Sequence, residues 1–97
     1  MMWRNEMLTA DQLIREVSSV LKQRGEQRDS SQGERSMERI VSVFNALHGT
    51  ELTVEQGWSF MVCLKLVRSF TGTAFRKDDY LDLIGYSGLL GEERYKV

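Results

Sequence analysis

A chain of 97 residues is the size of one compact domain, with no room for a second core. Its 13 Lys and Arg residues nearly balance its 14 Asp and Glu residues, so charge alone would not hold a nucleic-acid backbone, and generic nucleic-acid binding is not expected. A composition of 41% hydrophobic and 28% charged residues is typical of a globular rather than a disordered protein.

The compartment follows from what the sequence lacks. No segment approaches the roughly 20 apolar residues of a membrane span, and the N-terminus has no apolar core of signal-peptide length. The single cysteine, Cys63, excludes an internal disulfide and a cysteine-based metal cluster, and its apolar surroundings predict a buried thiol. We therefore expect a cytoplasmic protein with no membrane partner.

Helices are expected in chain order from capping signals and glycines, since proline is absent. The first spans residues 10–24: Thr9 and Gln12 form a capping box, apolar residues follow at helical spacing, and Gly25 is a natural end. Residues 1–8 before it are expected to form an N-terminal tail. The polar, glycine-flanked residues 25–33 after it are expected to form a mobile loop.

A second helix is expected over residues 34–47 and ends at Gly49. Its predicted buried stripe follows helical spacing and comprises Met37, Ile40, Val41, Phe44 and Leu47. His48, the only histidine, lies in the last turn, where the helix dipole favours a cation. We interpret it as a capping or surface residue.

The third helix, over residues 54–70, is hydrophobic on nearly every face. Thr53 and Gln56 form its capping box. A helix that is apolar all round is either central in its own domain or buried by a partner. Because this chain is too short to surround the helix completely, the pattern predicts a homo-oligomer.

The fourth helix is expected over residues 78–90, with three acidic residues near its N-terminus, where the dipole favours them. Gly85 and Gly88 predict a close backbone approach, because each costs about 1 kcal/mol of helix propensity relative to Ala. Residues 92–97 are expected to fray. The sequence thus predicts a compact, all-α, four-helix domain that spans residues 1–97.

Polar residues at apolar positions form the first candidate site. Lys65 and Arg68 share one face of the third helix, and Asp79, Asp82 and Tyr86 share one face of the fourth. The two sets could meet if the helices pack antiparallel. One interpretation is a salt-bridge cluster that fixes the helix register. The other is a polar pocket in which cations bind phosphate while carboxylates bind a metal, a ribose or a base.

A second basic set comprises Arg28, in the expected loop, with Arg35 and Arg39 on the second helix. Glu34 and Glu38 alternate with the helical pair, which is typical of a solvated, self-paired helix face. The alternative is an anion site, because a glycine-flanked loop before a helix N-terminus can bind phosphate. No phosphate-loop pattern supports that alternative.

Three segments together resemble a family of small phage and prophage proteins. They are residues 33–39 with 44–47, residues 57–68, and residues 78–82 with Tyr86. The resemblance covers about residues 24–92 and implies a viral origin. Small helical phage proteins commonly inhibit a host enzyme, sequester a nucleotide signal or trim nucleotide pools.

A more distant similarity is to helical nucleotide pyrophosphohydrolases of the MazG type, in which a Glu-x-x-Glu motif and a Glu/Asp-x-x-Asp motif clamp magnesium. Asp79 and Asp82 match the second motif. Glu34 and Glu38 are four residues apart and do not complete the first.

Three functions remain open. The preferred one is a non-catalytic binder in the host cytoplasm that sequesters a nucleotide signal to counter host defence. Its ligand-binding candidates are basic residues, two carboxylates and two aromatic residues that could stack on a base: Arg28, Arg35, Arg39, Lys65, Arg68, Asp79, Asp82, Trp58 and Tyr86. The second is a hydrolase with Mg²⁺ on Asp79 and Asp82; apart from this alternative, no cofactor is expected. The third is a module that blocks a host protein through an apolar patch. No catalytic residue is assigned.

Overall fold

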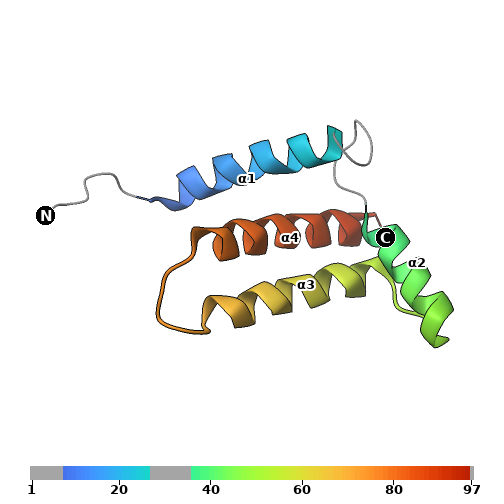
Figure 1. Cartoon of the computed structure of the whole chain (residues 1–97). Coiled ribbons are helices and arrows are strands. Elements are labelled where there is room, and N and C mark those ends of the chain that lie inside the picture. Colours follow the sequence, from blue (N-terminus) through green and yellow to red (C-terminus); the bar gives the residue numbers. More distant parts are fainter. Residues whose placement is uncertain (1–7, 27–35, 97) are drawn as a thin grey trace, which may run out of the picture.

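The computed structural model describes residues 8–26 and 36–96, and every regular element in these two ranges is a helix (Figure 1). The helices are α1 (Ala10–Arg24), α2 (Met37–His48), α3 (Val54–Ser69) and α4 (Lys77–Tyr95). α3 and α4 run antiparallel, and α1 lies along the other side of α4. α2 packs mainly against α3, and its Met37 and Val41 share one core cluster with Leu89 of α4. The prediction of an all-α, four-helix domain is confirmed.

The start of α1 is set by local chemistry. Thr9 accepts a hydrogen bond from the backbone of Gln12, and the Gln12 side chain accepts one from the backbone of Thr9. The helix ends at Arg24 as predicted, and Gly25 caps it in a right-handed conformation (φ −62°). Of the loop predicted over residues 25–33, residues 27–33 lie outside the described ranges, as do residues 1–7 of the predicted N-terminal tail.

The connection between α2 and α3 is organised by a single side chain. Asn45 Oδ1 accepts hydrogen bonds from the Thr50 hydroxyl (2.7 Å) and the Leu52 backbone (2.9 Å), and Asn45 Nδ2 donates to the Leu52 carbonyl (2.9 Å). Gly49 supplies the left-handed conformation (φ 64°) that ends α2, as predicted. These hydrogen bonds hold the connection in one conformation and so orient α2 relative to α3.

α3 begins with the predicted capping box between Thr53 and Gln56. Gly57, in its first turn, lies directly against α2: a Cβ built there would be 2.4 Å from Met37 Sδ and 3.1 Å from Val41 Cγ1. The absent side chain at Gly57 is therefore what allows α2 and α3 to approach so closely.

α4 extends five residues beyond its predicted end at Leu90, to Tyr95. The expectation that residues 92–97 fray is therefore wrong for 92–95. An ion pair between Arg94 and Glu55 of α3 ties the last turn to its neighbour. Gly85 approaches α1, with Val17 Cγ1 3.4 Å from its built Cβ, whereas Gly88 has nothing within 4 Å and makes no close approach.

The hydrophobic core is small. Among the described residues only five hydrophobic side chains are buried, and none of these is below 2% exposed: Val17, Met37, Val41, Trp58 and Leu89. Three positions expected in the buried stripe of α2 are instead exposed, namely Ile40, Phe44 and Leu47. Cys63, predicted to be buried, is also exposed. Over the described residues, no helix combines the length and hydrophobicity that crossing a membrane requires.

Candidate functional site

An ion pair between α3 and α4 forms the centre of the polar region. Lys65 Nζ lies 2.9 Å from Asp82 Oδ2, and the two side chains are only 14% and 21% exposed. Arg24, at the end of α1, approaches the other carboxylate oxygen of Asp82 at 3.9 Å. Asp82 therefore joins three helices, and the predicted meeting of the Lys65 and Asp82 faces is observed.

A cavity of about 290 Å³ lies where α3 ends and α4 begins. We call it the arginine cavity, because it is lined by Arg68, Thr71, Arg76 and Asp79. Arg68 is in the last turn of α3, and Arg76 is the residue immediately before α4. The short connection between the helices thus places both arginines at one opening, and neither has an ion-pair partner within the described residues.

Asp79 is the one buried charged residue in the described part of the chain, at 8% exposure. Its backbone N–H donates to the Arg76 carbonyl at 3.2 Å. Its carboxylate has no hydrogen bond or ion pair to another described residue. Among the described residues, no side-chain oxygen that is shut off from solvent lacks a hydrogen-bond partner, so the carboxylate oxygens of Asp79 are open to the cavity. Asp79 therefore presents an accessible hydrogen-bond acceptor on the same cavity as the two arginines.

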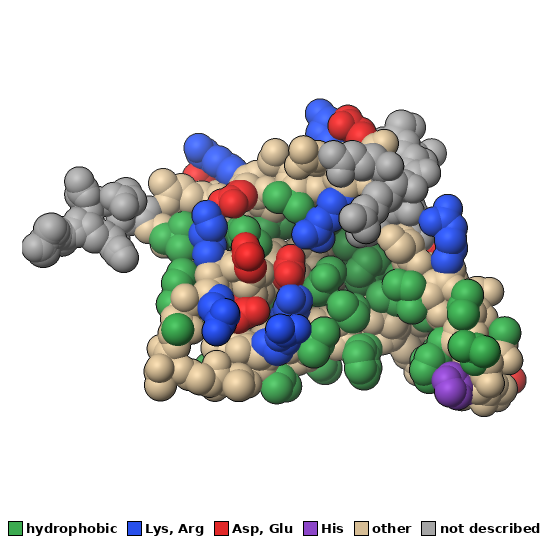
Figure 2. All heavy atoms as spheres, viewed as in Figure 1, with side chains coloured by type: hydrophobic (Ala, Val, Ile, Leu, Met, Phe, Trp, Pro, Cys, Tyr) green, Lys and Arg blue, Asp and Glu red, His purple; other side chains and the backbone are tan. Residues whose placement is uncertain are grey.

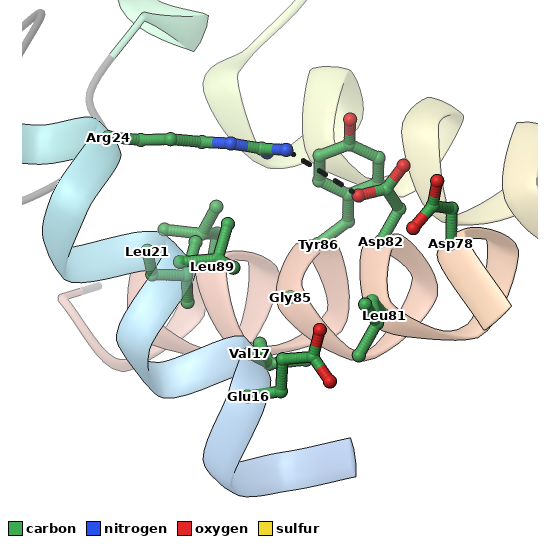
Figure 3. A pocket seen from close by; sticks show the side chains of 11 residues that line it. Glu16, Val17, Leu21, Arg24, Asp78, Leu81, Asp82, Gly85, Tyr86 and Leu89 are labelled. Atoms are coloured by element: carbon green, nitrogen blue, oxygen red, sulfur yellow. Dashed lines mark ion pairs between the residues drawn. The ribbon is translucent and has the colours of Figure 1, made fainter.

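A second cavity, which we call the α1–α4 groove, encloses about 240 Å³. Val17, Leu21, Gly85 and Leu89 are among its lining residues, and Figure 3 shows Arg24 directed toward Asp82. Its rim also carries carboxylates, of which Glu16 is paired with Lys77 at 3.1 Å. Carboxylates on this rim make the groove less suited to an anion than the arginine cavity is.

Comparison with protein families matches residues 12–94 to the family described as Domain of unknown function (DUF6378). The chain belongs to this family. No curated protein and no solved structure gives a significant match. The DUF6378 match includes all of α2 and α3 and nearly all of α1 and α4. Both cavities are therefore built from the family's own domain.

The two predicted stacking residues, Trp58 and Tyr86, differ in how far a ligand could reach them in this DUF6378 domain. Trp58 is 6% exposed in the core, and its ring stacks on Tyr86 with centroids 5.6 Å apart. The idea that Trp58 stacks on a ligand base is therefore wrong, because no ring face is open to a ligand. Tyr86 is partly buried and does line the α1–α4 groove.

The second predicted basic set is not assembled within the described ranges. Arg28 and Arg35 lie outside them. Arg39 is exposed on α2 and lines neither the arginine cavity nor the α1–α4 groove. Of the nine predicted ligand-binding residues, the structure associates five with the two cavities or with the central ion pair: Lys65, Arg68, Asp79, Asp82 and Tyr86.

Sequence reasoning missed two cations, Arg24 and Arg76. Both lie at helix ends, where the spacing rules that group residues on one helical face no longer apply. Their position at the junctions between predicted elements was the available signal. Within the described ranges, no group of three or more His, Cys, Asp or Glu side chains is placed to hold a metal ion.

Proposed function

We propose that this DUF6378 domain binds a phosphate-bearing small molecule, most simply a nucleotide, in the arginine cavity and releases it chemically unchanged. One observation carries the proposal: two arginines and an accessible carboxylate without a partner among the described residues line the same opening. Both halves of such a ligand, its phosphate and its hydrogen-bond donors, would find a complementary group there.

The phosphate would bind between Arg68 and Arg76. A guanidinium group binds phosphate through two parallel, charge-assisted hydrogen bonds, which are about twice as strong as neutral ones. The dipole at the N-terminus of α4 adds positive potential at the same place. Lys65 and Arg24 would have to break their ion pairs with Asp82 to bind an anion, whereas Arg68 and Arg76 form no ion pair with a described residue.

Asp79 would select which phosphate compounds bind. A carboxylate in the same cavity repels a bare phosphate ion, but it can accept hydrogen bonds from a hydroxyl or amine on the ligand. Nucleotides carry such donors on the ribose and on the bases. An analogue without such a donor would keep the charge repulsion and lose the hydrogen bond, so the site should bind it more weakly.

An exposed aromatic ring near the cavity could hold the base. Phe75 precedes Arg76 in the chain, is 65% exposed, and stacks on Tyr80 with centroids 5.5 Å apart and planes 15° from parallel. One face of the Phe75 ring is thus covered, and the other would be available for stacking worth about 1–3 kcal/mol. We propose Phe75 for the role first assigned to Trp58.

In biological terms, we propose that a phage-derived protein of this kind withholds a nucleotide signal in the host cytoplasm and so counters host defence. Such a role requires tight binding rather than turnover. We also propose that the working unit is a homo-oligomer, since the described residues bury so little of their hydrophobic surface.

Calorimetric titration with AMP, ATP and inorganic pyrophosphate, each in the presence of a chelator, tests this function. We expect Arg68→Ala to weaken nucleotide binding about 10- to 150-fold, which corresponds to the 1.5–3 kcal/mol of a hydrogen bond to a charged group. The matched control is Arg15→Ala, because Arg15 is an exposed arginine on α1 paired with Asp11. Asp79→Asn should weaken nucleotide binding and strengthen binding of pyrophosphate.

The same titration separates the alternatives. If none of the three probes binds the wild-type chain, or if Arg68→Ala binds them as well as Arg15→Ala does, the proposal is wrong. If magnesium-dependent release of phosphate or pyrophosphate accompanies binding, and Asp79→Asn abolishes it, the MazG-like hydrolase replaces the binder. Mass spectrometry of small molecules released from the purified, denatured protein would then identify the natural ligand.

A further inference from the structure

One face of α3 is apolar, uncharged and uncovered. Phe60, Cys63, Val67 and Phe70 follow at intervals of three and four residues and therefore lie along one side of the helix. Phe60 is 70% exposed, Val67 65% and Phe70 80%, and Cys63 is also exposed. We call these four residues the α3 stripe.

The charged residues of α3 all lie away from this stripe. Glu55 pairs with Arg94 of α4, Lys65 pairs with Asp82 of α4, and Arg68 lines the arginine cavity. α1 packs on α4 rather than on α3. The α3 stripe therefore faces outward, on the side of the helix opposite α4.

α2 continues the same kind of surface. Its exposed hydrophobic residues also follow helical spacing and comprise Ile40, Val43, Phe44 and Leu47. Figure 2 shows hydrophobic side chains gathered over α2 and along the lower edge of α3. The exposed hydrophobic residues of these two helices outnumber the five buried hydrophobic side chains in the described part of the chain, and monomeric proteins rarely leave large hydrophobic patches uncovered.

We propose that a second copy of this chain covers the α3 stripe, with the exposed face of α2 at its flank, in a two-fold symmetric dimer. A two-fold interface places a surface against itself, so any charge within it would meet an identical charge. The stripe carries none, which fits a copy of itself better than a partner recognised through charge. The inference names the surface of the homo-oligomer proposed above and does not depend on ligand binding.

The exposed area is sufficient for a stable dimer. With about 150–250 Å² per phenylalanine, Phe60 and Phe70 together present roughly 300 Å² at their observed exposures. Adding Leu66 and Val67 of α3 and the four exposed residues of α2, at on the order of 100 Å² each, brings the total to roughly 900 Å², comparable with the roughly 800 Å² per partner of a standard interface.

Cys63 makes the proposal testable without introducing a new reactive group at the interface. It lies within the stripe, between Phe60 and Phe70, and it is the only cysteine in the chain. When two identical helices cross at a two-fold axis, a residue near the axis faces its own counterpart. A short bismaleimide should therefore link two copies through Cys63 at micromolar concentration. The control is Cys63→Ser combined with Ser18→Cys, which moves the thiol to an exposed position on α1.

Light scattering should give at least twice the 11.2 kDa mass of one chain for the wild type. Val67→Glu and Phe70→Glu should each reduce it to one chain, whereas Ile14→Glu, at a 55% exposed position on α1, should not. Circular dichroism checks that every variant stays helical, and both stripe positions are exposed enough to accept a charge. A monomeric wild type would contradict any oligomer. An oligomer that survives both stripe variants, or that links as well through Ser18→Cys as through Cys63, would contradict this surface but leave ligand binding untouched.

Discussion

The pairing of Lys65 with Asp82 shows how a residue's partner decides what its loss costs. Replacing Asp82 by Ala leaves a largely buried ammonium group with no carboxylate. For a fully buried pair this costs about 3–5 kcal/mol, and the remaining exposure of 14% and 21% lowers our expectation to about 2–3 kcal/mol. Thermal unfolding followed by circular dichroism should therefore show a markedly lower Tm for Asp82→Ala.

Two controls show whether this loss comes from the unpaired charge. Asp11→Ala removes the same group from an exposed pair with Arg15 and should change stability by less than about 0.5 kcal/mol. The double variant Lys65→Met with Asp82→Leu removes both charges and should recover most of the loss, since apolar replacement of a buried pair is often neutral. If Asp82→Ala and Asp11→Ala melt alike, the pair contributes no more than a surface contact.

For single residues, the sequence predicted correctly which helical face a residue lies on, but not which face of a helix is buried. The spacing of Lys65 and Asp82 put each on a definite helical face, and the antiparallel helices bring those faces together. Trp58 and Cys63 lie on a helix that is apolar all round, so the pattern could not say which side α4 would cover. Trp58 turned inward and Cys63 outward.

At the scale of the helices, some helix ends are set by local sequence and others by contacts with another helix. The starts of α1 and α3 were predicted because each capping box is built from residues three apart in the chain. The last turns of α4, after Leu90, were not predicted because no local capping signal marks the end of the helix at Tyr95. Contact with α3, through Arg94 and Glu55, is what favours continuation of this helix.

Two glycine substitutions should change stability in opposite directions. Gly88→Ala adds a methyl group where nothing lies within 4 Å, so only the gain in helix propensity counts, and unfolding should cost about 0.5–1 kcal/mol more. Gly57→Ala gains the same propensity but forces buried Met37 out of its place, since Sδ and Cγ lie at 2.4 and 2.8 Å. Overpacking of this kind costs about 1–3 kcal/mol, so we expect a net loss.

Urea unfolding of the two variants beside the wild type measures both effects on one scale. The comparison is matched, because each variant makes the same chemical change inside a helix. A Gly57→Ala variant as stable as Gly88→Ala would mean that Met37 moves aside freely. The close approach of α2 and α3 would then not depend on this glycine.

At the scale of the whole molecule, the sequence predicted the number of helices and the excess of hydrophobic surface, but not where that surface would lie. The order and packing of the helices settle this: α4 lies between α1 and α3, and α2 turns outward (Figure 1). One side of α3 is therefore left open although the helix itself is paired. Periodicity alone could not separate the covered side from the open one.

A dimer formed through that open side should show a Tm that depends on protein concentration. Association stabilises the folded state by mass action, so each tenfold rise in concentration adds free energy, about 1.4 kcal/mol per mole of dimer. Shared between two chains of this size, that corresponds to a rise in Tm of roughly 3–6 °C. Calorimetric scans over a hundredfold range of concentration would resolve such a slope.

Two variants show which surface causes the dependence of Tm on protein concentration. Val67→Glu should melt at a concentration-independent temperature, because a charge in the α3 stripe prevents the two copies from meeting. Arg68→Ala should keep the wild-type slope, since the arginine cavity opens at the turn before α4 and not on the stripe. A wild-type Tm that does not move with concentration would mean that the five-residue core suffices alone, and the exposed side of α3 would need another explanation.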